Sequence, residues 1–300
     1  MQLSEAALYI FVEGVSDKYA YSRLADHECK DRRVDYRVVS AEEIGVGGGG
    51  KNVLLGFFDY LRRLGSLVDN FKGRTTVSIF FLDKDIDDLL RTKRRSAHVV
   101  YTQHYDIEGY YFIHGDICTA VAASVSLDIG SVRARISDYS SWRRQAASCW
   151  KEWVKLCIWS RVCPNGTMSY YGRPASQVHD RAYGPLTADL YANHLEQLSV
   201  ASGLPAAEFE ACFARLSKRI DRLFSKGEHD QVFKGRWYLP FLLEDIKAIA
   251  GSRLFNRNRN GLESRLVSSL QSTINFGEAW AEHFKVPLRA VLISANANCN

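Results

Sequence analysis

Four acidic side chains lie just after apolar stretches of the chain, where strands would end. Glu13 follows the run LYIFV at residues 8–12, Asp83 and Asp85 follow IFFL at 79–82, and Glu108 lies in YDIEGYYF at 105–112. On an extended chain, Asp83 and Asp85 point to the same side and can share one hard cation. Carboxylates this close shift one another's pKa values, so the group requires a divalent ion or bound protons.

The chemistry of these acids points to a hard metal ion. Carboxylate oxygens suit Mg²⁺ (or Mn²⁺) and disfavour zinc, for which the sequence offers no suitably placed thiolate or imidazole. A divalent ion at such a site polarises a phosphodiester, generates hydroxide from bound water and stabilises the leaving oxygen. The acidic residues therefore predict cleavage or transfer of a phosphodiester, with Mg²⁺ or Mn²⁺ as the cofactor.

The elements that must position these acids alternate between strand and helix. Strand character is found at 8–12, 36–40, 75–85 and 98–103, and the spacing of amphipathic helices at 16–28 and 52–65. This alternation predicts an α/β fold with a mostly parallel sheet flanked by helices, whose ligands gather at the carboxyl ends of the strands. If the first, third and fourth of these strands are neighbours, the four acids meet at one edge of the sheet.

From about residue 117 onward the pattern becomes helical. We therefore predict a metal-binding α/β domain over residues 1–125 and a mainly helical region over 126–300 for substrate, oligomer or partner contact. Trp142, Trp150 and Trp153 share one helical face, which is more typical of a core than of a base-stacking platform. Four basic residues flank these tryptophans: Arg143, Arg144, Lys151 and Lys155.

The glycine-rich stretch GVGGGGKN at 45–52 resembles a phosphate-binding P-loop. It follows the second strand instead of the first, and Asn52 stands where a P-loop needs a hydroxyl for magnesium, so an ATPase is excluded. Its backbone N–H groups and Lys51 can still hold a phosphate of a nucleic acid. The alternative is a flexible turn with a solvated lysine.

Charge also allows a polyanionic partner. The chain carries 39 basic and 34 acidic residues, a net charge of +5, which permits nucleic acid without requiring it. Directly after the Asp-x-Asp sequence, RTKRR places four cations beside the predicted metal site, where a phosphate backbone is expected. These nucleic-acid-binding candidates are Arg91, Lys93, Arg94 and Arg95.

Cysteine usage and hydropathy predict a cytoplasmic protein. Seven cysteines without a C-x-x-C pair argue against a disulfide framework and a structural zinc site. The apolar run at 6–12 is too short and too acidic at its ends, with Glu5 and Glu13, for a signal peptide. No segment approaches the ~20 apolar residues of a membrane helix, so we expect no membrane association.

These motifs resemble the TOPRIM family of topoisomerases, bacterial primases and related nucleases, whose signature is a Glu after the first strand and Asp-x-Asp after the third. Within it, the chain resembles the AriB-type effectors of PARIS anti-phage systems. FVEGVSDKYAY, GGGGK, FFLDKDID, YDIEGYYF and VFKGRWYLPFL occur in the same order. The resemblance covers residues 8–112. Beyond them it rests on the K-G-R-W sequence and on the helical character of the chain. Gly109 stands where relatives commonly have Asn.

The resemblance implies roles for single residues. Glu13 would be the general acid/base or a metal ligand, Asp83 and Asp85 would hold the catalytic metal, and Glu108 would be a ligand of a second metal. Asp17 completes the sequence E-G-x-x-D, either as a further metal ligand or as a cap of the following helix.

The resemblance also implies an activity and partners. Lys51 is a candidate catalytic lysine, because a lysine assists catalysis in related TOPRIM nucleases. The expected activity is metal-dependent cleavage of RNA, with tRNA as the implied substrate and DNA as the alternative. The effector would be held inactive by an ABC-type ATPase partner of the AriA kind, and would form a homo-oligomer, a dimer, when active.

Two other functions stay open. One is a catalytically silent TOPRIM-like subunit that binds or regulates an ATPase. The weaker one is a primase-like nucleotidyl transferase, for which the sequence offers no zinc-binding element.

Overall fold

The computed structural model describes residues 6–45, 48–71, 74–163 and 169–297. Contacts divide the chain into two compact units. The first comprises Met1–Lys84, Lys93–Gln103 and Ile274–Asn300, and the second comprises Asp85–Thr92 and His104–Thr273.

The first unit contains a mostly parallel sheet of five strands. These are β1 (Leu8–Val12), β2 (Tyr36–Ser40), β3 (Val68–Phe71), β4 (Arg74–Leu82) and β5 (Val99–Tyr101). β1 lies between β2 and β4 and is parallel to both; β5 is parallel to the end of β4, and β3 is antiparallel to its beginning. Val12 of β1 pairs with Phe81, and Leu82 pairs with Tyr101 of β5. The carboxyl ends of β1, β4 and β5 therefore meet at one edge.

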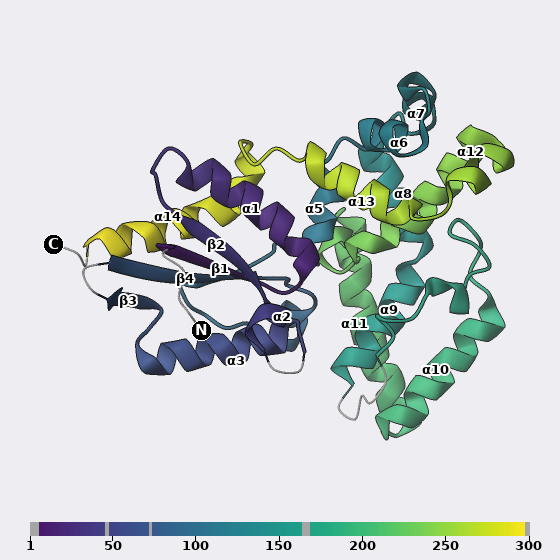
Figure 1. Cartoon of the computed structure of the whole chain (residues 1–300). Coiled ribbons are helices and arrows are strands. Elements are labelled where there is room, and N and C mark those ends of the chain that lie inside the picture. The colour runs from purple at the N-terminus through teal and green to yellow at the C-terminus, as the bar shows by residue number, and fades with distance from the viewer. Residues whose placement is uncertain (1–5, 46–47, 72–73, 164–168, 298–300) are drawn as a thin grey trace. The chain divides into compact units, whose positions relative to one another are not determined.

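Helices cover both faces of this sheet (Figure 1). The helical elements of the unit are α1 (Val15–Cys29), α2 (Ala41–Ile44), α3 (Lys51–Leu64), η4 (Ala279–Ala281) and α14 (Glu282–Ala297). Alternate side chains of each strand point to opposite faces. On one face Phe80 packs edge-on against Phe58 of α3, and on the other Phe81 stacks on Tyr21 of α1 and contacts Phe284 of α14. The apolar stripe predicted for residues 52–65 is confirmed by this packing.

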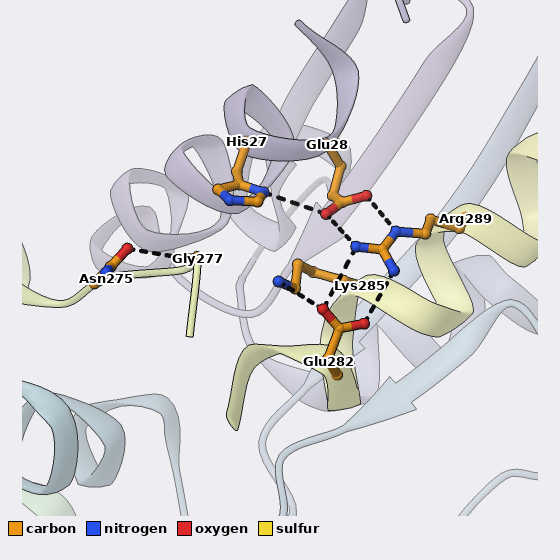
Figure 2. A network of polar contacts seen from close by, with 7 residues as sticks. All are labelled: His27, Glu28, Asn275, Gly277, Glu282, Lys285 and Arg289. Atoms are coloured by element: carbon orange, nitrogen blue, oxygen red, sulfur yellow. Dashed lines mark hydrogen bonds and ion pairs between the residues drawn. The ribbon is translucent and has the colours of Figure 1, made fainter. Parts of the chain in front are cut away.

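Helix α14 is joined to α1 by ion pairs (Figure 2). Arg289 donates to both carboxylate oxygens of Glu28, at 2.6 and 2.8 Å, and Glu282 accepts from Arg289 at 3.0 Å and from Lys285 at 2.7 Å. The hydrogen-bonded guanidinium lowers the pKa of the buried Glu28 carboxyl.

The end of the chain thus belongs to the sheet unit, and residues 104–125 belong to the helical one, which differs from the predicted boundary at residue 125. Periodicity indicates a helix but does not say which core it covers.

The second unit is mainly helical. Its α-helices are α4 (Asp87–Leu90), α5 (Ile107–His114), α6 (Ile117–Val125), α7 (Ile129–Arg135), α8 (Tyr139–Cys149), α9 (Lys151–Val162), α10 (Ala188–Ser202), α11 (Ala206–Ser225), α12 (Leu239–Asn258) and α13 (Leu262–Thr273). Its 3-10 turns are η1 (Ala175–Gln177), η2 (His229–Gln231) and η3 (Gly235–Tyr238). Trp142, Trp150 and Trp153 are buried in this unit, which confirms that they belong to the core.

The predicted α/β class with a mostly parallel sheet and a helical region is confirmed. Within the described part of the chain, no helix is both long and apolar enough to span a membrane. The cysteines at 29, 118, 149, 157, 163 and 212 are free thiols.

Candidate functional site

The carboxylate of Glu13 is fixed at the carboxyl ends of β1 and β4. Its Oε1 atom accepts a hydrogen bond of 2.8 Å from the backbone N–H of Asp83, a residue 70 positions later in the chain. Each residue directly follows its strand, and both are half-buried. The parallel pairing of two strands therefore brings two of the predicted metal ligands together.

The glycine-rich turn ends beside Glu13. Gly50 has φ 84° and ψ −176°, a conformation that strongly favours glycine, and its N–H donates to the Glu13 carbonyl oxygen at 3.3 Å. Lys51 follows as the first residue of α3. Val46 and Gly47 of the same turn lie outside the described residues. The turn therefore ends at the candidate edge, and its phosphate-binding role stays a prediction.

Asp17 caps helix α1. Its Oδ2 atom accepts from the N–H of Gly14 at 2.9 Å, and its Oδ1 atom accepts from the Ser16 hydroxyl at 3.1 Å. The N–H of Asp17 in turn donates to the Gly14 carbonyl at 3.1 Å. The bond from the Gly14 N–H to the Asp17 carboxylate is one half of a capping box, because Gly14 has no side chain to form the other half, and it accounts for Asp17 as a cap. Its role as a metal ligand stays a prediction.

The chain is not extended at Asp85, contrary to the expectation for the Asp-x-Asp sequence. Asp85 has φ 50°, in the left-handed region, and its N–H donates to the Tyr105 carbonyl at 2.7 Å. The preceding residue, Lys84, is buried, and its N–H and ammonium group donate to Thr102 Oγ1 and the Gln103 carbonyl, both at 2.7 Å. These bonds turn the chain as it leaves β4, so strand alternation does not decide where the Asp85 side chain points.

Glu108 is paired with an arginine from a distant segment. Arg236 Nε donates to Glu108 Oε1 at 2.7 Å, and the Glu108 side chain is 11% exposed. The adjacent Asp106, the N-cap of α5, accepts backbone N–H bonds from Gly109 at 2.8 Å and Gly235 at 3.0 Å. Burial, and then the nearby Glu108 carboxylate, raise the pKa of Asp106 well above its ordinary value. The K-G-R-W and YDIEG sequences thus form one structure within the second unit.

Gly235 allows this close approach of the two segments. A Cβ atom there would lie 2.2 Å from the Gly109 nitrogen and 2.4 Å from the Glu108 carbonyl carbon, both backbone atoms. We expect Gly235→Ala to lower the free energy of unfolding by about 1–3 kcal/mol or more, because the backbones must separate. Gly109→Ala is the matched control, since its Cβ would meet only ordinary contacts at 3.5 Å. Urea unfolding of both variants tests this prediction. Equal losses of unfolding free energy in Gly235→Ala and Gly109→Ala would contradict it.

A buried ion pair supports the turn that carries Asp85. Arg143 donates to Asp230 Oδ2 at 2.6 Å, and the Tyr238 hydroxyl donates to Oδ1 at 2.7 Å. The Asp230 carbonyl accepts from the N–H of Tyr105 at 2.8 Å, and Tyr105 holds Asp85 as described above. Burial alone raises the pKa of the Asp230 carboxyl, but the Arg143 charge and smaller contributions outweigh it, so the pKa lies below its ordinary value. Asp85 is thereby linked, through the backbone of Tyr105, to a buried ion pair.

His114, at the end of α5, makes stability depend on pH. Burial, and then the Arg143 charge, lower its pKa from 6.5 to about 4. Between these values the unfolded chain binds a proton that the folded chain does not, so stability falls as the pH decreases from about 6.5 toward 4. We expect His114→Gln to flatten this part of the profile, measured as urea midpoints at pH 7, 6 and 5. Identical slopes in both proteins would contradict the assignment to His114.

The basic stretch after the acids is only partly available to a ligand. Arg94 forms an ion pair with Asp59 at 3.3 Å, and the Lys93 ammonium lies 5.3 Å from the centre of the Tyr101 ring. Arg91 and Arg95 are exposed.

The second basic group contributes to the fold. Arg143 and Lys155 are largely buried in ion pairs, and Lys151 pairs with Asp221 at 3.1 Å. These cations are therefore occupied by acidic partners, whereas Arg144 is exposed.

The structure brings together Glu13 with Asp83 in the first unit and Glu108 with Asp106 in the second. In the described ranges, no three His, Cys, Asp or Glu side chains are grouped so as to hold a metal ion. Glu13 and Asp83 belong to one unit and Asp85 and Glu108 to the other, so the meeting of all four stays a prediction. The donor chemistry of the Glu13–Asp83 pair fits Mg²⁺, since both side chains offer carboxylate oxygens.

The sequence interpretation missed Asp106, Asp230 and Arg236. An Asp directly before a helical run, as Asp106 is before α5, is a signal for an N-terminal cap. The K-G-R-W sequence contains Arg236, but nothing in the sequence indicates that Glu108 is its partner. Compared with models of known protein families and with curated proteins, the chain matches none.

Proposed function

We propose that the chain is a metal-dependent phosphodiesterase, a nuclease of the TOPRIM type. The observation that supports this most is the bond between the Asp83 N–H and the Glu13 carboxylate, at the edge where the carboxyl ends of β1 and β4 meet. Ligands of open α/β sheets gather at this edge. A carboxylate held in place by the backbone has little freedom to lose when it binds an ion or takes a proton.

In this proposal, Glu13, Asp83 and Asp85 hold Mg²⁺ or Mn²⁺. A bound divalent ion supplies positive charge at the phosphodiester and makes water more acidic. Glu13 also serves as the general acid/base, for which its fixed Oε1 atom is suited. The backbone N–H groups of the glycine turn and the Lys51 ammonium orient the phosphate at the start of α3.

The proposed substrate is RNA, with tRNA as the first candidate and DNA as the alternative. The exposed Arg91 and Arg95 would contact its backbone, as would Lys93 and Arg94. An ABC-type ATPase partner would hold the nuclease inactive, a dimer would be the active form, and the cytoplasm its location. The free cysteines agree with a reducing compartment.

The experiment incubates the purified full chain with total tRNA and with plasmid DNA, in Mg²⁺, Mn²⁺ or EDTA. Cleavage of tRNA that requires the metal is expected. Where the isolated chain is inactive, the same assay is repeated with the co-expressed ATPase partner. Cleavage that persists in EDTA, or no cleavage in either arrangement, contradicts the proposal.

A catalytically silent binding subunit is the second candidate. It is favoured by the ion pair between Glu108 and Arg236, which occupies a carboxylate that a second metal would need. If the chain is such a binding subunit, the variant Asp83→Asn/Asp85→Asn is expected to keep the full biological effect of the wild type in cells. Asparagine suits position 85, because Asn tolerates the left-handed backbone there. Loss of the effect in that variant favours the nuclease.

A further inference from the structure

Helix α11 of the second unit carries a row of basic side chains that the proposed catalytic chemistry does not use. Each member is three or four residues from another, so all lie on one side of the helix, within an arc of about 100°. The row is about 16 Å long at ~1.5 Å per residue. This basic face consists of five exposed residues: Arg215, Lys218, Arg219, Arg222 and Lys226, the last being the C-cap.

The opposite face of α11 packs into the core of its unit. Ile220 and Phe224 are buried, and Phe209 meets the ring of Trp159 on α9 edge-on, with ring centres 5.2 Å apart. Figure 1 shows α11 beside α9. The basic face is therefore carried by a helix whose place within the unit is fixed by packing.

The charge of the basic face is not neutralised by acids. Within the part of the chain that the structure describes, none of its cations forms an ion pair. Arg215 donates to a neutral partner, Cys212 Sγ, at 2.9 Å. Asp221 of the same helix is engaged by Lys151 and Lys155 of α9, at 3.1 and 3.0 Å. The row thus presents an uncompensated positive charge to solvent.

The cations of the basic face repel one another. Three pairs are four residues apart, for example Lys218 and Arg222, and like charges at this distance destabilise a helix. Cations favour the carboxyl end of a helix only within its last turn, so this effect does not account for Arg215 or Lys218. A polyanion relieves the repulsion when it binds, and the row is therefore better explained as a ligand surface than as a support of the helix.

The side chains of α11 also select the class of partner. Among the described residues, none of the exposed large apolar side chains belongs to this helix. A membrane-bound amphipathic helix and the centre of a protein interface both depend on such side chains. The phosphates of one strand of a duplex repeat every ~3.4 Å along its axis, so a row of about 16 Å runs beside roughly five of them. We propose that the basic face binds the phosphate backbone of a nucleic acid.

This inference deepens the proposed function by giving the nuclease a second surface for its substrate. The guanidinium of an arginine can donate two parallel hydrogen bonds to a phosphate, and three of the five residues are arginines. Contacts to phosphates position a nucleic acid without reading its sequence. The inference rests on the proposed function only for the identity of the nucleic acid as substrate, because binding is measured without cleavage.

The test measures binding of labelled tRNA and of a labelled DNA duplex by fluorescence anisotropy in EDTA, between about 50 and 200 mM KCl. Lys218→Gln/Arg219→Gln/Arg222→Gln should bind at least about tenfold more weakly. The slope of log K against log salt should become shallower by about 2–3, because each phosphate contact contributes ~0.7–0.9. Since the three positions are exposed, the urea midpoint should stay nearly unchanged. Unchanged affinity and slope in this variant overturn the inference.

The matched control removes three positive charges at exposed positions elsewhere in the same unit, Arg133→Gln/Lys247→Gln/Arg259→Gln. It should bind both nucleic acids like the wild type. An equal loss in the two triple variants means that only the net charge of the chain matters, which overturns the inference.

Vesicles that contain phosphatidylserine test the other polyanionic partner. The wild type should bind them more weakly than tRNA or DNA. Vesicle binding that the α11 variant abolishes, while its binding of nucleic acid stays unchanged, assigns the basic face to a membrane surface and overturns the inference. Of tRNA and DNA, the one whose binding falls more in the α11 variant identifies the source of the phosphates.

Kinetics separate this inference from the proposed function. If the chain cleaves tRNA, the α11 variant should raise KM and keep kcat, because contacts made equally in the ground state and the transition state affect KM alone. Weaker binding by the α11 variant of a chain that never cleaves supports the basic face and contradicts the nuclease. Cleavage with unchanged binding and KM supports the nuclease and overturns the basic face.

Discussion

Replacing Glu13 by glutamine is expected to reduce metal-dependent cleavage at least about 100-fold, the range in which general acid–base groups contribute. The substitution removes the negative charge and the exchangeable carboxyl proton. It keeps the shape of the side chain and an oxygen that can accept the 2.8 Å bond from the Asp83 N–H. The variant should therefore unfold at nearly the same urea concentration as the wild type.

The matched control for this variant is Glu278→Gln, the same change at an exposed residue of the same unit. It should cleave like the wild type. Cleavage rates are compared on one substrate at equal protein and Mg²⁺ concentrations. If Glu13→Gln keeps wild-type activity, Glu13 has no catalytic or ligand role, and the proposal loses its main support.

Arg143→Met is expected to lower the free energy of unfolding by about 3–5 kcal/mol, because it leaves Asp230 as a buried charge without its ion-pair partner. The side chains of Arg143 and Asp230 are 13% and 11% exposed and lie 2.6 Å apart. Since the Asp230 carbonyl also holds Tyr105, the loss should reach the turn at Asp85 and reduce activity as well.

The neighbouring Arg144 gives a sharp control for this prediction. It lies on the same helix and is exposed, so Arg144→Met should change stability by no more than about 0.5 kcal/mol. The double variant Arg143→Met/Asp230→Asn should lose less unfolding free energy than the sum of the losses in its two single variants. Each single variant leaves one buried charged group without its partner, whereas the double variant removes both charges. Equal effects at positions 143 and 144, or additive losses in the double variant, would contradict a coupled ion pair.

Local patterns predicted the sheet well. The four strand runs correspond to β1, β2, β4 and β5, and the two amphipathic runs to α1 and α3, because apolar periodicity reflects which faces are buried. The short antiparallel β3 was not predicted, since its sequence VDNF carries only two apolar residues. The return of α14 to the sheet depends on a tertiary contact, the pairing of Arg289 with Glu28, that periodicity does not contain.

The sequence could predict which residues of the candidate site lie together only where the pairing of strands determines their positions. Glu13 and Asp83 come together because each directly follows one of two paired parallel strands. Asp85 departs from expectation because its backbone bond to Tyr105 overrides the alternation of an extended chain. The pairing of Arg236 with Glu108 joins residues 128 positions apart, and no local rule relates them.

Binding of Mn²⁺ tests most directly whether the edge of the sheet at Glu13 and Asp83 holds a metal ion. Free Mn²⁺ is followed by electron paramagnetic resonance while wild-type protein, Glu13→Gln, Asp83→Asn and the control Glu278→Gln are titrated. We expect wild type and control to bind Mn²⁺ at least about tenfold more tightly than the other two variants. Identical Mn²⁺ binding by all four proteins would contradict the account.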